Sequence, residues 1–481
     1  MRQSGFVLVG LVLCSASLSA TNLTIESTEK AQEVIANAVE AYGGADAIRD
    51  MKSIEVASST STFATNQSLR PGPPWDENTF SSVNAIDYET QTFANLSQGS
   101  GGGFEFNNGI VVSADSGHQL DFRAGTVTEQ AQPDFDVTSG PFIRVSPLLL
   151  VKALSERPSA SHYLGEAPVE GRTHDVINLV MNAGPALTLY FDQETHLLSR
   201  SERNLPGFGL VAYRFSGYEK SDGLVYHKRF ELFVNDQSNM DRKIERVSFN
   251  HSLEKIMSAG KALRVTEAQA PAPMATNKVS DGVYHVGGNG TYSMFVDAGD
   301  YLIAVGTTGG ADERIRHLRE TIPNKPIRYA VITHHHNDHL AGVPAYVAEG
   351  ATLVTSSEHA DVVRATAGED SNAKIETVDK RRTFKAGDQT LQLDVIGPTA
   401  HTNKLVLAWL PKTGIAFEAD HFALPTSGEI PPAVSSTRSF AKALKKKRIK
   451  AKKFLSAHSP RVATAEELKT AIAKKGATTA P

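Results

Sequence analysis

Five side chains of the kinds that bind metal ions lie within six residues of the sequence, and four of them have a spacing that suits a shared site. The segment HHHNDH, residues 334–339, has the spacing H-x-H-x-D-H and directly follows the apolar run IRYAVIT. Imidazole and carboxylate groups in such clusters hold zinc, iron or manganese. Burying His334, His336, Asp338 and His339 together would be costly unless a cation neutralised and ordered them. The spacing therefore indicates a metal site, and a solvated histidine-rich loop is the alternative interpretation.

Three more segments in the same half of the sequence end on residues of these kinds. His401 follows the strand-like run QLDVIG, Asp420 ends the run TGIAFEAD, and His458 ends the run KKFLSAH. A single His or Asp at the end of a strand is usually structural or faces solvent. Four strand ends in one domain that all carry ligand-type residues favour one shared site, so we expect His401, Asp420 and His458 to join the first cluster.

Strands and helices alternate around these residues. YSMFVDAG, YLIAVG and IRYAVIT are typical of buried strands, and ADERIRHLRETI is typical of an amphipathic helix. This alternation predicts strands on the inside and helices on the outside, from about residue 278 onward. The basic run KALKKKRIKAKK, residues 442–453, predicts an exposed helix with a solvated face, and attraction of anionic lipid headgroups or acidic substrates is the alternative.

The first half of the sequence has a different pattern. Apolar spacing predicts a helix over residues 27–42, with Ser27 as its cap, and strand-like segments extend from about 52 to 250. The glycine-rich segment SQGSGGG, residues 97–103, predicts a flexible loop. We therefore expect an α+β domain at 21–262, in which a helix packs on a large antiparallel sheet. An Ala- and Pro-rich linker is expected at 263–277.

Length, charge and cysteine content narrow the classes of function. The chain has 481 residues, which suits two or three domains. Lys and Arg total 49 against 53 Asp and Glu, and this even balance argues against a nucleic-acid partner. The one cysteine, Cys14, excludes an intramolecular disulfide and any thiol nucleophile in the body of the chain. A small-molecule substrate fits this composition better.

The N-terminus has the pattern of an export signal. Arg2 precedes the short apolar run FVLVGLVL and the small residues CSASLSA, so residues 1–20 are expected to be a cleaved signal peptide. The run is shorter than the roughly 20 residues that a membrane-spanning helix needs. We expect a secreted or periplasmic protein, with lipidation at Cys14 as a minor alternative.

The second half resembles the metallo-β-lactamase fold superfamily, whose members carry H-x-H-x-D-H, then a separate His, an Asp and a His in that order. The resemblance covers about residues 278–475 and implies an αββα catalytic domain. It implies one metal held by His334, His336 and His401. It implies a second metal held by Asp338, His339 and His458, with Asp420 bridging the two. His335 and His421 adjoin these ligands and are expected to face outward.

The resemblance also implies a reaction class. Two zinc ions per chain would share a bridging hydroxide that attacks an ester, lactone, thioester or phosphodiester, and Asp338 would be the catalytic residue that orients water or moves its proton. Iron or manganese are alternative metals. An Asp at 420, where β-lactamases generally have Cys or Ser, makes β-lactam hydrolysis less favoured. The family's Asp is also absent from the early strand segment 303–307.

The first half weakly resembles the half-barrel domains of outer-membrane lipoprotein carriers and sorting proteins, over about residues 27–250. This resemblance carries no catalytic motif and implies either an apolar or lipid ligand in the N-terminal domain or an accessory scaffold. Two alternatives to the hydrolase therefore stay open. One is a mononuclear iron dioxygenase of the persulfide type, and the other is a lipid or lipoprotein carrier with an accessory metal domain.

Overall fold

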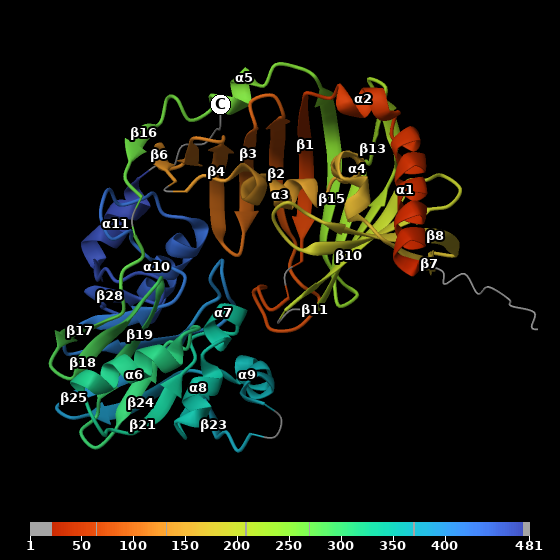
Figure 1. Ribbon diagram of the computed structural model, residues 1–481. Coiled ribbons are helices and arrows are strands. Elements are labelled where there is room, and N and C mark those ends of the chain that lie inside the picture. Colours follow the sequence, from red (N-terminus) through yellow and green to blue (C-terminus); the bar gives the residue numbers. More distant parts are fainter. Residues whose placement is uncertain are drawn as a thin grey trace, which may run out of the picture.

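The computed structural model describes residues 22–63, 65–130, 132–206, 209–268, 270–368 and 371–474. The predicted signal peptide, residues 1–20, lies outside these ranges. Within them, no helix is both long enough and apolar enough to cross a membrane. Figure 1 shows two parts, an N-terminal one built mainly from one large sheet and a C-terminal one in which sheets and helices are layered.

One sheet of 14 strands forms most of the N-terminal part (Figure 1). Its order is β16-β6-β5-β4-β3-β2-β1-β15-β14-β11-β10-β9-β8-β7, and neighbours are antiparallel except β16 and β6. Its strands are β1 (Ser53–Thr62), β2 (Asn78–Asp87), β3 (Thr92–Gly101), β4 (Phe104–Val112), β5 (Gly117–Asp121), β6 (Thr126–Glu129), β7 (Tyr163–Val169), β8 (Arg172–Val180), β9 (Ala186–Asp192), β10 (Leu198–Leu205), β11 (Gly209–Ser216), β14 (Arg229–Val234), β15 (Gln237–Phe249) and β16 (Arg264–Thr266). A separate hairpin consists of β12 (Glu219–Ser221) and β13 (Leu224–Tyr226).

Four helices pack into one core with this sheet, and a fifth packs in a separate cluster with Ala85 and Ala94. They are α1 (Leu23–Ala41), α2 (Ala45–Arg49), α3 (Phe135–Ile143), α4 (Pro147–Glu156) and α5 (Glu254–Met257), with a 3₁₀ turn at Pro158–Ala160. The apolar stripe of α1 packs into the core together with α4 and the strands, because its spacing puts Val34, Ile35 and Ala38 on one face. The predicted cap was wrong: the Asn22 side chain accepts the Ile25 amide, and the Ser27 hydroxyl instead donates to the Tyr163 carbonyl.

Two sheets and flanking helices form the C-terminal part. The first sheet contains β17 (Ala275–Ser280), β18 (Val283–Gly288), β19 (Thr291–Asp297), β20 (Leu302–Val305), β21 (Ile327–Val331), β22 (Thr352–Thr355) and β23 (Ile375–Thr377). The second contains β24 (Arg381–Ala386), β25 (Gln389–Ile396), β26 (Leu405–Leu410), β27 (Ile415–Glu418), β28 (Lys453–Ser456) and β29 (Ala463–Thr464). The helices are α6 (Ala311–Thr321), α7 (Asn337–Leu340), α8 (Val343–Ala348), α9 (Ala360–Ala367), α10 (Ser435–Lys447) and α11 (Ala465–Ala473), with a 3₁₀ turn at Ser357–His359.

Apolar side chains from both sheets meet in one core, which includes Met294, Val331, Leu393 and Leu407. A second core lies between the first sheet and helices α6, α8 and α9. Helix α10 contributes Phe440 and Leu444 to the first core, while the lysines of its last turn are exposed. The expected alternation of strands and helices is therefore present.

The boundary between the two parts is shorter than the linker expected at 263–277. Strand β16 pairs with β6 of the N-terminal sheet, and β17 already pairs with β18 of the C-terminal part. The pairing of β16 with β6 could not be predicted, because a strand of three residues is too short to show a periodic apolar pattern.

The glycine-rich segment 97–103 is not the flexible loop that its composition predicted. Residues up to Gly101 belong to β3, and only Gly102 and Gly103 form the turn into β4. Both turn residues have left-handed backbone angles, with φ of 58° and 84°, which glycine adopts without steric cost. This turn reaches the C-terminal part, because the Ser436 amide donates to the Gly103 carbonyl over 2.8 Å.

Candidate metal centre

All seven predicted ligands lie just after strand ends at one edge of the C-terminal part. The segment carrying His334 and His336 follows β21 and leads into α7, which carries Asp338 and His339. Three further side chains follow β25, β27 and β28, namely His401, Asp420 and His458. Strands from both sheets end here, so the edges of the two sheets together form the site.

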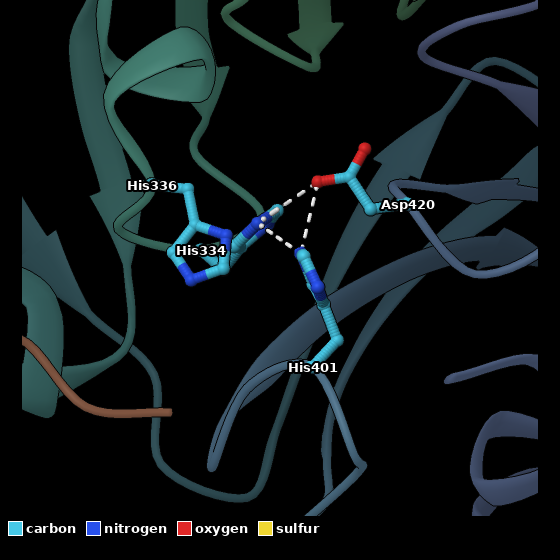
Figure 2. A group of neighbouring side chains, drawn as sticks. All are labelled: His334, His336, His401 and Asp420. Carbon is cyan, nitrogen blue, oxygen red and sulfur yellow. Dashed lines mark hydrogen bonds and ion pairs between the residues drawn. The ribbon is translucent and has the colours of Figure 1, made fainter. Parts of the chain in front are cut away.

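Four of these side chains form a first group, shown in Figure 2. The ring nitrogens Nε2 of His401 and His334 face each other at 3.2 Å. Asp420 Oδ2 lies 3.1 Å from His401 Nε2 and 3.2 Å from His334 Nε2. His336 completes the group, and all four offer ligand atoms within 4.8 Å of one another. Three nitrogens and one oxygen at this spacing match a tetrahedral donor set.

A second group lies directly beside the first. It contains Asp338, His339, Asp420 and His458. His339 Nε2 lies 2.7 Å from Asp420 Oδ2 and 3.3 Å from His458 Nε2. Asp338 Oδ2 lies 3.2 Å from His339 Nε2. This group is less enclosed than the first, because about half of the Asp338 side chain and a third of the His458 side chain are exposed.

Asp420 belongs to both groups, and its backbone is held in an unusual conformation. Its Oδ2 faces the first group, and its Oδ1 lies 2.7 Å from His458 Nε2 in the second. Asp420 has φ of 63°, a left-handed angle that few non-glycine residues adopt and that recurs at functional sites. The buried carboxylate of Glu418 accepts the amides of His421 and Phe422, over 2.8 and 3.0 Å. Glu418 therefore fixes the turn that aims Asp420.

Electrostatics keeps the two aspartates ionised. Burial alone would raise the pKa of Asp420, but His339, His334 and His401 lower it well below its usual range. Burial likewise opposes ionisation of Asp338, yet hydrogen bonds from His339 and His458 hold its pKa far below normal. Burial lowers the pKa of His336 to about 3, so this imidazole is neutral and keeps a lone pair for a cation.

The same carboxylates act on the histidines of the second group. Burial opposes protonation of His339, but Asp420 and Asp338 raise its pKa to about 9. Hydrogen bonds to Asp338 and Asp420 raise the pKa of His458 to about 10, again against burial. A cation bound between these carboxylates and imidazoles would take the place of the added protons.

The N-terminal part supplies hydrogen-bond partners for two ligands of the first group. His401 Nδ1 lies 2.6 Å from the Gly102 carbonyl, and His336 Nε2 lies 3.0 Å from the Ser68 carbonyl. A carbonyl only accepts, so each imidazole donates through that nitrogen. The other nitrogen of each ring then carries its lone pair. Such outer partners fix the tautomer and orientation of metal-binding histidines.

The donor set in the structure fits a metal. His336 Nδ1 is buried and has no hydrogen-bond partner among the described residues. The nitrogens of His334 and His401 face each other with a carboxylate between them. Buried polar atoms are rarely left without a partner, and a cation would satisfy these nitrogens together.

The loop that carries Ser68 is tied down by polar contacts. Asp76 accepts the Leu69 amide over 2.7 Å and pairs with Arg70 over 2.6 Å. The Ser68 hydroxyl in turn accepts the Asp76 amide at 2.6 Å. No pattern of side chains predicts these hydrogen-bond partners of the histidines, because every residue has a backbone carbonyl.

Two histidines beside the ligands were expected to face outward, and this was wrong. His335 is fully buried and points away from both groups, toward the Ser68 carbonyl at 3.0 Å and the ring of His359. His421 is also buried and bonds to Thr399. Neither belongs to a ligand group. They form a packed layer behind the ligands instead of facing solvent.

The segment 303–307 lacks the Asp that the family often has there, but Thr307 of the same segment makes a hydrogen bond to the metal-centre region. The Thr307 hydroxyl donates to the His339 carbonyl over 2.5 Å. A hydroxyl therefore holds the backbone of one of the seven clustered side chains.

The family comparison agrees with this geometry. Residues 286–458 match the family model described as the metallo-beta-lactamase superfamily. These residues form a metallo-β-lactamase superfamily domain. The match includes all seven clustered side chains and none of the N-terminal sheet. No curated protein matches the chain.

Several solved structures are similar to part of the chain. A metallo-β-lactamase from Pontibacter korlensis has 23% identity and a TM-score of 0.33, covering 41% of this chain and 97% of its own. The metallo-β-lactamase FIM-1 from Pseudomonas aeruginosa in its mono-zinc form has 21% identity and a TM-score of 0.33, covering 42% and 94%. The flavodiiron protein from Giardia intestinalis has 19% identity and a TM-score of 0.34, covering 42% and 59%.

Proposed function

We propose that the protein is an exported, metal-dependent hydrolase that holds two zinc ions per chain. The observation that carries this proposal is the sharing of Asp420 between two adjacent ligand groups, each of which also contains histidines. Metal ions that share a carboxylate in this way are typical of paired hydrolytic centres. Membership of the superfamily domain supports the same reaction class. Export is proposed from the signal-like pattern of the first 20 residues.

Two bound zinc ions would lower the pKa of water and polarise the acyl or phosphoryl oxygen of a substrate. The residues of the chain would orient the metal-binding groups and accept a proton. His336 and His401 keep their lone pairs toward the site because Ser68 and Gly102 accept their other ring hydrogens. Asp338 is ionised and about half exposed, so it is available to orient water and accept a proton.

For an ester, the bonds change as follows. The water oxygen bonds to the acyl carbon, and the water proton passes to Asp338. The bond from the acyl carbon to the alcohol oxygen breaks, and that oxygen takes up a proton. The products are a carboxylate, an alcohol and one released proton. No serine or cysteine nucleophile is needed.

Metal analysis and a hydrolysis panel test this proposal together. The purified chain is expected to hold about two zinc per molecule and to hydrolyse at least one ester, lactone, thioester or phosphodiester. Asp420→Ala is expected to lower metal content and abolish turnover, because it removes a ligand from both groups. Asp388→Ala, an exposed aspartate in the same domain, is the matched control. A single iron per chain, with no hydrolysis, would instead support the dioxygenase alternative.

A further inference from the structure

A chamber of about 490 Å³ lies between the two parts of the molecule and reaches the metal centre. Asp420 and His458 are among its lining residues, whereas His334 and His336 are not. A molecule in the chamber would therefore approach the centre from the side of the second ligand group. The volume lies within the range of small-molecule sites, about 300–1,000 Å³.

The walls of the chamber are mainly apolar and come from both parts. Strand β4 contributes Phe104 and Phe106, and Phe104 keeps 38% of its surface exposed although it lies beside His401. The C-terminal part contributes the apolar residues Phe422, Leu424, Pro431, Pro432, Ala433 and Val434. Exposed aromatic surface next to a reactive centre is typical of a ligand-binding wall.

The guanidinium in the chamber wall is already paired with a carboxylate, and the Asp121 carboxylate of the same wall accepts the Arg123 and Ala124 amides over 2.9 and 2.8 Å. Among the described residues that line it, Arg123 is the one Lys or Arg. Its guanidinium donates to the Glu105 carbonyl over 2.9 Å and lies 3.5 Å from the Glu105 carboxylate. That carboxylate also accepts the Ser435 amide over 3.0 Å and the Ser435 hydroxyl. No unpaired cation is thus available among these residues for a phosphodiester, and the site suits an uncharged apolar group.

A neighbouring groove differs in chemistry. It has a volume of about 1,000 Å³ on the N-terminal sheet and shares Glu105, Phe106, Asn107, Arg123 and Ala433 with the chamber. Serine, threonine, asparagine and glutamine side chains line it, with three carboxylates and three cations. The apolar part of a substrate therefore belongs in the chamber, whose walls carry fewer charged side chains than the groove.

We infer that the chamber binds the apolar acyl chain of an ester or thioester substrate, with β4 of the N-terminal part as one wall. This inference rests on the proposed hydrolase and names its substrate class. Hydrolysis joins water oxygen to the acyl carbon, breaks the bond to the alcohol or thiol, and leaves the acyl chain as a carboxylate in the chamber. The N-terminal part then contributes residues that contact the substrate.

The test uses p-nitrophenyl acetate, butyrate, hexanoate and octanoate with the zinc-loaded chain. kcat/KM is expected to rise about fourfold for each added CH₂ group that enters the chamber. Ala433→Trp fills the chamber, and Phe106→Ala removes part of its wall. Each is expected to lower the octanoate-to-acetate ratio of kcat/KM by about tenfold. Leu164→Ala, at an exposed leucine on β7, is expected to keep the ratio of the unaltered chain.

Direct binding of the free acids separates this inference from the hydrolase itself. Octanoate is expected to bind the zinc-loaded chain at least about tenfold more tightly than butyrate, and Ala433→Trp is expected to remove the difference. Hydrolysis without any dependence on chain length would overturn the chamber assignment and leave the hydrolase standing. Chain-length-dependent binding without hydrolysis of any ester would support the chamber and count against the hydrolase. Loss of both would overturn both.

Discussion

The Gly102 carbonyl in the turn between β3 and β4 contacts His401 of the metal centre. Changing this turn tests whether the N-terminal part affects the affinity for metal. A Cβ atom at Gly103 would lie 2.7 Å from the Ala400 carbonyl oxygen, closer than real Cβ contacts. Gly103→Ala must therefore push the turn away from residue 400. Gly102 adjoins Gly103, and His401 adjoins Ala400. The 2.6 Å hydrogen bond from His401 Nδ1 to the Gly102 carbonyl is therefore expected to break.

The expected loss follows from the role of that bond. Removing the outer partner of a metal-binding histidine typically costs 10- to 100-fold in metal affinity, which is about 1.4–2.7 kcal/mol. Gly223→Ala is the matched control, since Gly223 has φ of 85° against 84° for Gly103 and no atom lies within 4 Å of the place that its Cβ would take. Both substitutions carry the same left-handed backbone cost of about 1–2 kcal/mol.

Zinc affinity measured by competition with a chromophoric chelator separates the two variants, and urea unfolding records the backbone cost that they share. Gly103→Ala is expected to bind zinc at least about tenfold more weakly than Gly223→Ala. Both variants lose unfolding free energy from the backbone cost, and Gly103→Ala loses more because of its clash with Ala400. Equal zinc affinities in the two variants would refute the idea that the N-terminal part orients His401.

Three other perturbations have expected outcomes. Asp76→Ala frees the loop that presents the Ser68 carbonyl to His336, so zinc affinity should fall about tenfold in the same competition assay, and an unchanged affinity would contradict this. Chelation should lower the urea midpoint of the C-terminal part and added zinc should restore it, because a ligand bound only by the folded state stabilises that state; a midpoint insensitive to chelator would count against a metal centre. Burial and Arg242 hold the pKa of His227 at about 3, below its ordinary 6.5, so folding stability falls as the pH drops below about 6.5. Between pH 7 and pH 5 the unaltered chain should lose about 2 kcal/mol more than His227→Phe in urea unfolding, and equal losses would exclude this histidine as the cause.

The clustering of the predicted metal-binding side chains could be anticipated because much of its signal is local. The spacing of His334, His336, Asp338 and His339 lies within one strand end and one short helix, where the backbone fixes how side chains can point. The remaining three each follow a strand with a clear apolar pattern. Strand ends at one sheet edge converge, so the structure brings these residues together as expected.

Other features were missed or misjudged because they depend on packing. The 97–103 segment has the composition of a loop, yet its partner strands order most of it as β3. His335 and His421 have polar rings that favour solvent in isolation, yet the second layer of the site buries both. The cap of α1 lies five residues before the predicted one, because apolar spacing defines the face of a helix better than its ends.

Residue type and short spacing were enough to predict which seven side chains meet. Folding was needed to bring carbonyl groups 268 and 299 residues away to the rings of His336 and His401, and to place β4 along one side of the chamber. Backbone carbonyls are the same at every position of a chain. Their role is set by where folding places them, which no residue pattern records.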